Sequence, residues 1–351
     1  MDLTRLVTVD DFEAAAQARL APMTWDYYRS GADEEHTLRR NRDAWTKHAV
    51  WYRALVDVAA PRVATTLLGA EVASPIHVAP TAYHALACAE GERATARACA
   101  SAGAIYVAST LATTSLEDVA DAAPEGRRWF QLYVHRERDF TMRLVDRAKA
   151  AGYGAIVVTC DTPVLGRRCA DVKNGFALPR GMTMANLVEI LPPDLKDGAG
   201  SELARFVAQR HDPCFGWKDL RELADRAAPM PIVVKGIVRG DDAKLALDHG
   251  ARAVWVSNHG GRQLDLAPAT ADALVEIVAA LGSSAEVYVD GGVRSGMHAL
   301  VALGLGARAV FVGRPILWGL AAAGAAGVAR VLAILDEELT RGMQLAGCPD
   351  L

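Results

Sequence analysis

Several features that would assign this chain to a familiar class are missing from its sequence. The six cysteines form no C-x-x-C pair and have no neighbouring His-x-His pattern, which argues against structural zinc and favours reduced thiols in a cytosol. The formal net charge is only −4, so neither a nucleic acid nor a membrane surface is an expected partner. We expect no metal site.

No segment has the length and apolarity of a membrane span or a secretion signal. The longest apolar stretch, Gly319–Leu335, is mostly Ala and Gly and contains Arg330, so it is too weak for a span. The first residues, Met1–Arg5, lead into an acidic segment with no apolar core, so we expect no secretion signal. These two absences predict a cytoplasmic protein.

The chain is long enough for a full core, since it has 351 residues of which 51% are hydrophobic. That length suffices for one large domain or two smaller ones. The first part, residues 1–75, predicts helices over Val9–Leu20, Met23–Ser30 and Asp33–Trp45. We expect a single domain over 1–351, with this helical segment preceding a repeating part over 76–351.

A regular alternation begins at residue 76, where short apolar runs alternate with Ala-rich helical stretches. The runs are Ile76–Ala79, Ala104–Ala108, Trp129–Tyr133, Ala155–Thr159, Ile232–Val234, Ala253–Val256, Val287–Val289 and Ala309–Val312. Strands without polar alternation, separated by helices, predict a parallel sheet that is covered on both faces. Eight such units favour an α/β fold of the (β/α)8, or TIM-barrel, type. A Rossmann fold is disfavoured because no G-x-G-x-x-G follows the first run.

One interval is much longer than the others, because about seventy residues separate the fourth and fifth runs. Within it, the stretch Leu191–Ser201 is rich in turn-forming residues. A long insertion after a barrel strand is usually a lid, although a disordered insertion is equally compatible with this composition. We expect a mobile, lid-like loop at about 177–216.

The stretch Ser257–Asp265 is the most distinctive in the chain. It follows the sixth run and places His259 and Arg262 on either side of two glycines. His titrates near neutral pH, and the planar guanidinium of Arg fits a carboxylate. Glycines allow a sharp turn and close approach, so we expect the loop to pass near a ligand. Read alone, the stretch is equally compatible with a polar turn after a core strand.

In a barrel, the carboxyl ends of all strands meet at one mouth, and here those positions are polar. Asp290–Arg294 follows the seventh run and Gly313-Arg314 the eighth, where barrels often bind phosphate. A second group, close to the other strand ends, offers a base, a carboxylate, two guanidiniums and two phenols: His259, Asp161, Arg168, Arg262, Tyr27 and Tyr133. Lys235 ends the fifth run, where an ammonium can offset charge on a cofactor ring.

With these residues identified, the chain resembles the FMN-dependent (S)-2-hydroxy-acid oxidase family, which includes glycolate oxidase, lactate oxidase, mandelate dehydrogenase, 4-hydroxymandelate oxidase and flavocytochrome b2. The resemblance runs nearly end to end. Its motifs are Asp26-Tyr27-Tyr28, Ala79-Pro80-Thr81-Ala82, Phe130-Gln131-Leu132-Tyr133, Asp161-Thr162-Pro163, Gly166-Arg167-Arg168, Val234-Lys235-Gly236, Ser257–Asp265, Asp290–Arg294 and Gly313-Arg314-Pro315.

The resemblance implies a role for each site residue. His259 is the base with Asp161 as its partner, Arg168 and Arg262 hold the substrate carboxylate, and Tyr27 and Tyr133 bond the substrate. Lys235 stabilises the reduced flavin. The residues implied to line the flavin and ribityl chain are Pro80, Thr81, Ala82, Ser109, Gln131, Thr159, Ser257 and Asp290, and those implied to take the phosphate are Gly291, Gly292, Arg294, Gly313 and Arg314.

The prediction of the substrate rests on one position at which this chain differs from the glycolate-oxidising members of the family. Glycolate-oxidising members tend to have Trp where this chain has Leu111, with Tyr83 expected to border the same space. We therefore expect a 2-hydroxy acid larger than glycolate, mandelate-like or lactate-like, although Leu111 can also simply repack against its neighbours. The resemblance further implies O₂ as electron acceptor, with a quinone or a protein left open, and a homotetramer or homo-octamer. A phosphate-binding isomerase barrel and a non-catalytic barrel are the competing interpretations.

Overall fold

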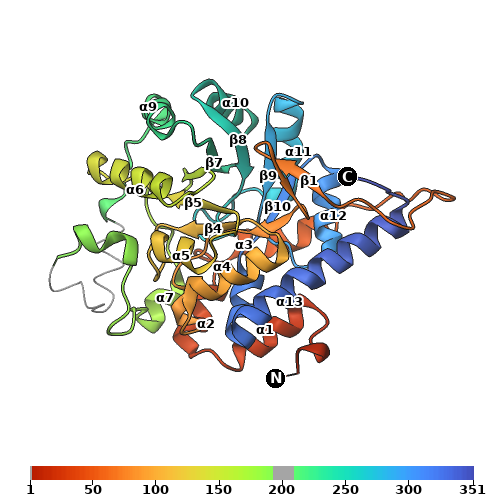
Figure 1. Ribbon diagram of the computed structural model, residues 1–351, viewed down its shortest axis with the longest axis horizontal. Coiled ribbons are helices and arrows are strands. Elements are labelled where there is room, and N and C mark those ends of the chain that lie inside the picture. Colours follow the sequence, from red (N-terminus) through yellow and green to blue (C-terminus); the bar gives the residue numbers. More distant parts are fainter. Residues whose placement is uncertain (1, 193–208) are drawn as a thin grey trace.

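The computed structural model describes residues 2–192 and 209–351. Its centre is a closed barrel of parallel strands in the order β10-β3-β4-β5-β6-β7-β8-β9 (Figure 1). The strands are β3 (Ile76–Val78), β4 (Tyr106–Ser109), β5 (Arg128–Leu132), β6 (Ile156–Thr159), β7 (Ile232–Ile237), β8 (Ala251–Val256), β9 (Glu286–Val289) and β10 (Ala309–Val312). Each overlaps one of the predicted runs, so the TIM-barrel prediction is confirmed.

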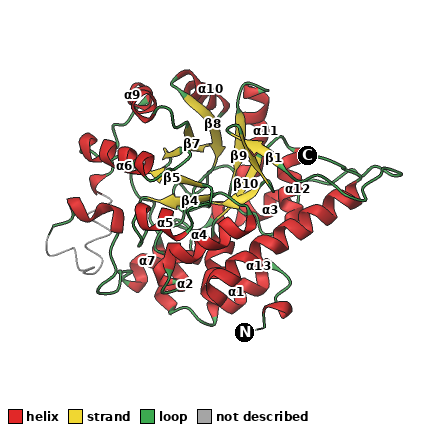
Figure 2. Cartoon of the chain, in the orientation of Figure 1, coloured by secondary structure: helices red, strands yellow, loops and turns green. Residues whose placement is uncertain are grey.

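Helices surround the barrel, as Figure 2 shows in red around the yellow strands. They are α4 (Gly91–Ala102), α5 (Leu116–Ala122), α6 (Arg138–Ala150), α9 (Trp217–Ala227), α10 (Gly240–Asp248), α11 (Thr270–Leu281), α12 (Gly296–Gly304) and α13 (Arg314–Ala346). Three helices precede the barrel, namely α1 (Val9–Gln17), α2 (Pro22–Arg29) and α3 (His36–Trp45). The predicted N-terminal helical segment is therefore present, and its helices end within a few residues of the expected positions.

The strands lack polar alternation because both of their faces are buried. In β8, Ala253 and Trp255 belong to the cluster inside the barrel, whereas Val254 and Val256 belong to the cluster between barrel and helices. Inside, the rings of Trp129, Tyr288, Phe311 and Trp255 pack in one layer, with Trp255 and Phe311 only 3.9 Å apart between centroids. This aromatic layer fills the barrel beneath its mouth, so it serves as a solid floor.

The opposite end of the barrel is covered by a short antiparallel hairpin. It consists of β1 (Thr65–Leu67) and β2 (Ala70–Val72). Leu67 and Val72 are buried and belong to the same cluster as the barrel interior. The hairpin therefore excludes water from the bottom of the barrel and leaves the carboxyl end as the accessible one.

The long interval between β6 and β7 is described on both sides of residues 193–208. Its first part contains α7 (Cys169–Asn174) and the short 3-10 helix Ala185–Ile190, and its last part returns at residue 209. Most of the predicted lid stretch, Leu191–Ser201, lies outside the described residues. The described flanks do reach the barrel mouth, where Phe176, Met184 and His211 line a cavity.

Helix α13 is the one helix in the described ranges that is long and apolar enough to cross a membrane, judged by length and composition alone. It packs against α1, α4 and α12, and it lies beside α1 in Figure 1. Its backbone leaves the helical conformation at Ala323 and Gly324. These contacts are those of a core helix of the barrel.

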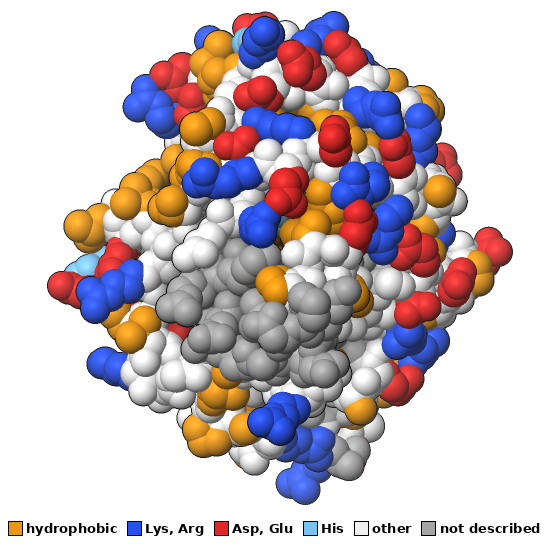
Figure 3. Space-filling view, turned by 90° about the vertical axis from the view of Figure 1, so that its left-hand side faces the viewer, with side chains coloured by type: hydrophobic (Ala, Val, Ile, Leu, Met, Phe, Trp, Pro, Cys, Tyr) orange, Lys and Arg blue, Asp and Glu red, His pale blue; other side chains and the backbone are white. Residues whose placement is uncertain are grey.

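Charged side chains of both signs lie among the described residues on the face drawn in Figure 3. Basic and acidic side chains are interspersed over the upper part of that view. This mixture agrees with the small net charge of −4.

Candidate active site

A cavity of about 530 Å³ opens at the carboxyl ends of the barrel strands. Every site residue predicted from the sequence lines it except Asp161 and Ser257. Those two lie directly behind the wall, where Asp161 contacts His259 and Ser257 contacts Lys235. The structure therefore gathers into one place residues from all eight strand ends and from α2.

A polar layer lies one step above the aromatic floor, because side chains two residues apart on a strand point the same way. Trp129 is thus followed by Gln131, Trp255 by Ser257 and Tyr288 by Asp290. The other members of the layer are Ser109, Thr159 and Lys235. The alternation that builds the core also places these polar groups under the cavity.

Hydrogen bonds divide this layer into two halves. In one half, Gln131 accepts from the Ser109 hydroxyl at 3.1 Å and donates to Thr159 at 3.0 Å. In the other, the Lys235 ammonium donates to Ser257 at 2.7 Å and pairs with Asp290 at 3.1 Å. Ser257 in turn donates to Asp290 at 2.8 Å. Ser257 is not in the cavity wall, so its observed contacts orient Lys235 and Asp290.

The end of the cavity near β9 and β10 has the features of a phosphate site. Gly291 and Gly292 have φ angles of 96° and 77°, which glycine adopts readily. Helix α13 begins at Arg314 with Gly313 as its N-cap and no side-chain cap, so the Arg314 N–H has no intrahelical partner and the N-terminus of the helix favours an anion. The buried Nε of Arg294 has no hydrogen-bond partner among the described residues. An anion held here would satisfy these donors.

Arg314, which was also predicted to bind phosphate, has a second task. Its guanidinium donates to the carbonyls of Tyr28 at 2.9 Å, Gly260 at 3.0 Å and Ser30 at 2.9 Å. It lines the cavity as expected. Its observed contacts, however, join α2 to the loop after β8, which the sequence did not indicate.

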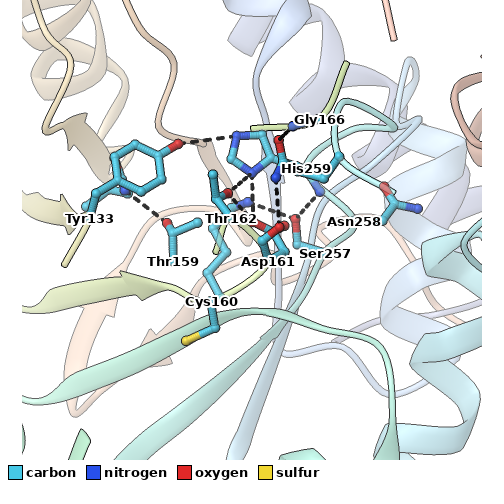
Figure 4. Close-up of polar contacts among 12 residues, drawn as sticks. Tyr133, Thr159, Cys160, Asp161, Thr162, Gly166, Ser257, Asn258 and His259 are labelled. Carbon is cyan, nitrogen blue, oxygen red and sulfur yellow. Dashed lines mark hydrogen bonds and ion pairs between the residues drawn. The ribbon is translucent and has the colours of Figure 1, made fainter. Parts of the chain in front are cut away.

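The predicted base and its partner are in direct contact (Figure 4). Nδ1 of His259 lies 2.8 Å from an Asp161 carboxylate oxygen, and the Tyr133 hydroxyl lies 3.4 Å from Nε2. The Thr162 hydroxyl donates to the same Asp161 oxygen at 2.9 Å. Asp161 thus fixes one ring nitrogen and leaves Nε2 directed to the cavity.

The surroundings of His259 keep the ring neutral. Burial lowers the pKa of His259 below its ordinary 6.5, Asp161 acts in the opposite direction, and the charges of Lys235 and Arg168 lower it further. For Asp161, burial raises the pKa, but His259 and Lys235 outweigh burial and the net pKa is lowered. A neutral imidazole beside an ionised carboxylate is the arrangement required of a general base.

Two guanidinium groups flank the ring of Tyr27 at the other side of the cavity. The Arg262 guanidinium lies 4.9 Å from the ring centroid, and that of Arg168 lies 5.8 Å away. Burial and the charge of Arg168 lower the pKa of Arg262 to about 10. Two enclosed like charges repel each other, and a ligand carboxylate between them removes that repulsion.

The two glycines after His259 have different surroundings. Gly260 lines the cavity, but a Cβ there would lie 2.8 Å from an Arg314 nitrogen. A Cβ on Gly261 would lie 2.6 Å from the backbone nitrogen of Leu38. The loop thus reaches the cavity as expected, at Gly260, while the absence of a side chain at Gly261 makes room for α3.

Sequence reasoning missed the residues that the long insertion contributes to the cavity. Phe176 stacks on Tyr27, with centroids 4.1 Å apart, and Met184 and His211 line the same space. Asp171 lies beside Arg168, at 3.9 Å. No motif marks these residues, because only the folding of the insertion over the mouth brings them there.

The fold is a closed α/β barrel whose mouth brings together an unpartnered arginine donor, a paired His259 and Asp161 and two buried guanidinium groups, and comparisons with known proteins show its family. Residues 16–351 match the model of the FMN-dependent dehydrogenase family. The chain is 47% identical to 2-hydroxyacid oxidase 1 of Homo sapiens, covering 99% of this chain and 95% of that protein. It is 47% identical to an L-lactate oxidase of Nostoc sp., covering 98% and 95%.

Among solved structures, the chain is similar to mandelate oxidase with (S)-4-hydroxymandelic acid. The TM-score is 0.92 at 42% identity, over 98% of this chain and 96% of that one. This protein belongs to the FMN-dependent dehydrogenase family and is an FMN-dependent 2-hydroxy-acid oxidoreductase. The interpretations as a non-catalytic barrel and as an isomerase barrel are not supported.

The observed residues fit FMN. The unpartnered Nε of Arg294 and the open start of α13 suit its phosphate, while the polar layer offers donors and acceptors to a ribityl chain and a flavin ring. Lys235, at 4% exposure, is the cation of that layer. When bound, FMN supplies a two-electron acceptor.

Proposed function

We propose that this enzyme oxidises an (S)-2-hydroxy acid larger than glycolate, mandelate-like or lactate-like, to the 2-keto acid and transfers the electrons to O₂. The substrate loses two protons and two electrons in all, and O₂ takes up two protons and two electrons to become hydrogen peroxide. The oxidases named among the relatives and the mandelate oxidase structures with bound acids support this reaction class.

The proposal for a larger substrate rests mainly on the apolar wall beside the anion clamp. Leu111, Tyr83, Phe176 and Met184 all line the cavity, and the rings of Tyr83 and Phe176 pack against Tyr27 of the clamp. A leucine at 111 is smaller than an indole and leaves room for an α-substituent. An α-hydrogen alone, as in glycolate, would leave that space poorly filled.

The chain's own groups account for binding and proton transfer. Arg168 and Arg262 hold the carboxylate and thereby fix both the position and the rotation of the substrate. Nε2 of His259 accepts the proton that leaves, and Asp161 stabilises the imidazolium that forms, across their 2.8 Å contact. The Tyr133 hydroxyl, 3.4 Å from that nitrogen, bonds the oxygen being converted to a carbonyl.

A panel of 2-hydroxy acids tests the substrate. We expect kcat/KM for lactate or mandelate to exceed that for glycolate by about tenfold or more, since each extra methylene in an apolar pocket contributes roughly 10-fold or more. Steady-state peroxide release and anaerobic flavin reduction measure the two half-reactions separately. A higher kcat/KM for glycolate than for both larger acids would overturn the proposal, and slow reoxidation by O₂ would favour a quinone or protein acceptor.

Replacing either clamp arginine is expected to weaken substrate binding by about 100-fold, the cost of losing a hydrogen bond between charged groups. The two variants should differ in stability. Arg262 donates to the carbonyls of Tyr27 and Ser30 at 2.6 and 2.9 Å, so Arg262→Met should lower Tm more than Arg168→Met. Anaerobic titrations give the substrate Kd, thermal melts give Tm, and an unchanged Kd in Arg168→Met would remove that residue from the clamp.

We further propose a homotetramer or homo-octamer, and a cytoplasmic location stays a prediction. The segment near residue 50 supports self-association, because Trp51 is 92% and Tyr52 75% exposed, and exposed apolar groups of this size are typical of interfaces. Light scattering coupled to size-exclusion chromatography measures the mass. A monomer at micromolar concentration would contradict the proposed assembly.

A further inference from the structure

His211, on the returning part of the long insertion, packs face to face with Tyr133. The two ring centroids are 4.6 Å apart, and the ring planes are inclined by 22°. The edge of His135 meets the His211 ring at 5.9 Å and 83°. His211 is only 4% exposed and Tyr133 only 8%. The Tyr133 ring, whose hydroxyl approaches His259, is therefore supported on one face by an imidazole from the insertion.

The backbone holds His211 in place independently of its side chain. The N–H of Arg136 donates to the Arg210 carbonyl at 2.8 Å, and the N–H of Asp212 donates to the Val134 carbonyl at 2.9 Å. His135 and His211 form an antiparallel bridge between these two bonds. A substitution at 211 should thus change the ring without detaching the chain from the end of β5.

His211 is one of three residues that lie between two cavities. The cavity of about 530 Å³ at the barrel mouth, which has room for cofactor and substrate, and a second cavity of about 300 Å³ have only Tyr133, Thr159 and His211 in common. The second cavity is otherwise lined by residues such as Cys160, Phe215 and Trp217. Burial lowers the pKa of His211 to about 4, although the Thr162 carbonyl opposes this shift. The partition is therefore a neutral ring at neutral pH.

We propose that His211 determines substrate size, by closing the substrate cavity toward the second cavity and by holding the Tyr133 ring in position. This inference rests on the proposed function, since it concerns the α-substituent of the 2-hydroxy acid. With the imidazole in place, compact substituents fit and long ones meet the partition. Removing the ring joins the two cavities and admits longer chains.

The test compares His211→Ala, which removes the ring, with His211→Phe, which retains a stacking face. Lactate serves as the short substrate and 2-hydroxyoctanoate as the long one. We define kred as the rate constant of flavin reduction by a bound substrate. In His211→Ala, we expect kred/Kd for 2-hydroxyoctanoate, divided by kred/Kd for lactate, to rise about tenfold or more, in line with the effect of a methylene in an apolar pocket. The rate constant kred for lactate should fall about tenfold as Tyr133 loses its support, and His211→Phe should restore it to within about threefold.

Phe215→Ala is the matched control, because Phe215 lines the second cavity and not the first. It enlarges the second cavity without removing the partition, so its substrate ratio should equal that of the wild type. FMN content and Tm verify folding in each variant, and the Kd values of the matching 2-keto acids, from flavin absorbance, measure binding without turnover.

The results distinguish a failure of the inference about His211 from a failure of the proposed function. If no 2-hydroxy acid reduces the flavin of the wild type, the proposed function itself is wrong. If the wild type is reduced but His211→Ala keeps the wild-type ratio, His211 does not determine substrate size. If His211→Phe loses lactate reduction as severely as His211→Ala, the stacking role is overturned.

Discussion

Substituting His259 with alanine is expected to reduce the rate of flavin reduction by about two to four orders of magnitude, while FMN stays bound. Removing a general base typically costs about 10²–10⁴-fold, and here the alanine also removes the Nδ1–H that donates to Asp161 at 2.8 Å. The cofactor should be retained because the phosphate donors and the polar layer do not depend on this ring. Anaerobic stopped-flow absorbance measures the reduction directly.

Two further measurements show whether the lower rate of His259→Ala reflects the loss of a base. Imidazole added to the buffer should restore part of the rate in His259→Ala, since the vacated space adjoins the open cavity. His249→Ala is the matched control, because its ring contacts only the end of α10 and Trp217 in the part of the chain described, and it should reduce at the wild-type rate. Reduction of His259→Ala near the wild-type rate would show that another group removes the proton.

Substituting Asp161 with asparagine is expected to lower flavin reduction by about 10²–10⁴-fold, because the imidazolium that forms loses its compensating charge. The pH dependence should change as well. Asp161 raises the pKa of His259, while burial, Lys235 and Arg168 lower it. Without the carboxylate, only the influences that lower the pKa of His259 remain. The acid limb of the rate profile should therefore move to lower pH.

The wild-type profile provides the reference for that shift. Because the pKa of His259 is already below its ordinary 6.5, the base should be fully available at neutral pH and be lost only as pH falls through that lowered value. Rates of flavin reduction measured from pH 5 to 9 locate the acid limb in the wild type and in Asp161→Asn. An acid limb that moved upward in Asp161→Asn, or a rate close to wild type, would contradict the assigned pairing.

The barrel and much of its site were predictable because they follow from local patterns. Each apolar run formed a strand, and the closed sheet placed every carboxyl end at one mouth. The period of two along each strand then positioned Gln131 above Trp129 and Ser257 above Trp255. Family motifs supplied the roles, which the observed contacts of His259 and Asp161 accommodate.

Other assignments were beyond local reasoning because they depend on contacts distant in sequence. Arg314 bonds the carbonyls of Tyr28 and Ser30, some 285 residues earlier. The absence of a side chain at Gly261 makes room for α3. These residues match the family's motifs, yet part of their observed work is to join the N-terminal helices to the barrel.

By itself, the sequence determined the strands of the barrel, the candidate site residues and the family, since apolar periodicity and short motifs are local properties of the chain. Only the tertiary structure decided the shape of the space that a substrate must fill. Phe176 and His211 come from opposite flanks of an insertion without a motif, and they reach the cavity through ring stacking on Tyr27 and Tyr133. Packing between side chains of this kind depends on three-dimensional proximity, which no local pattern encodes.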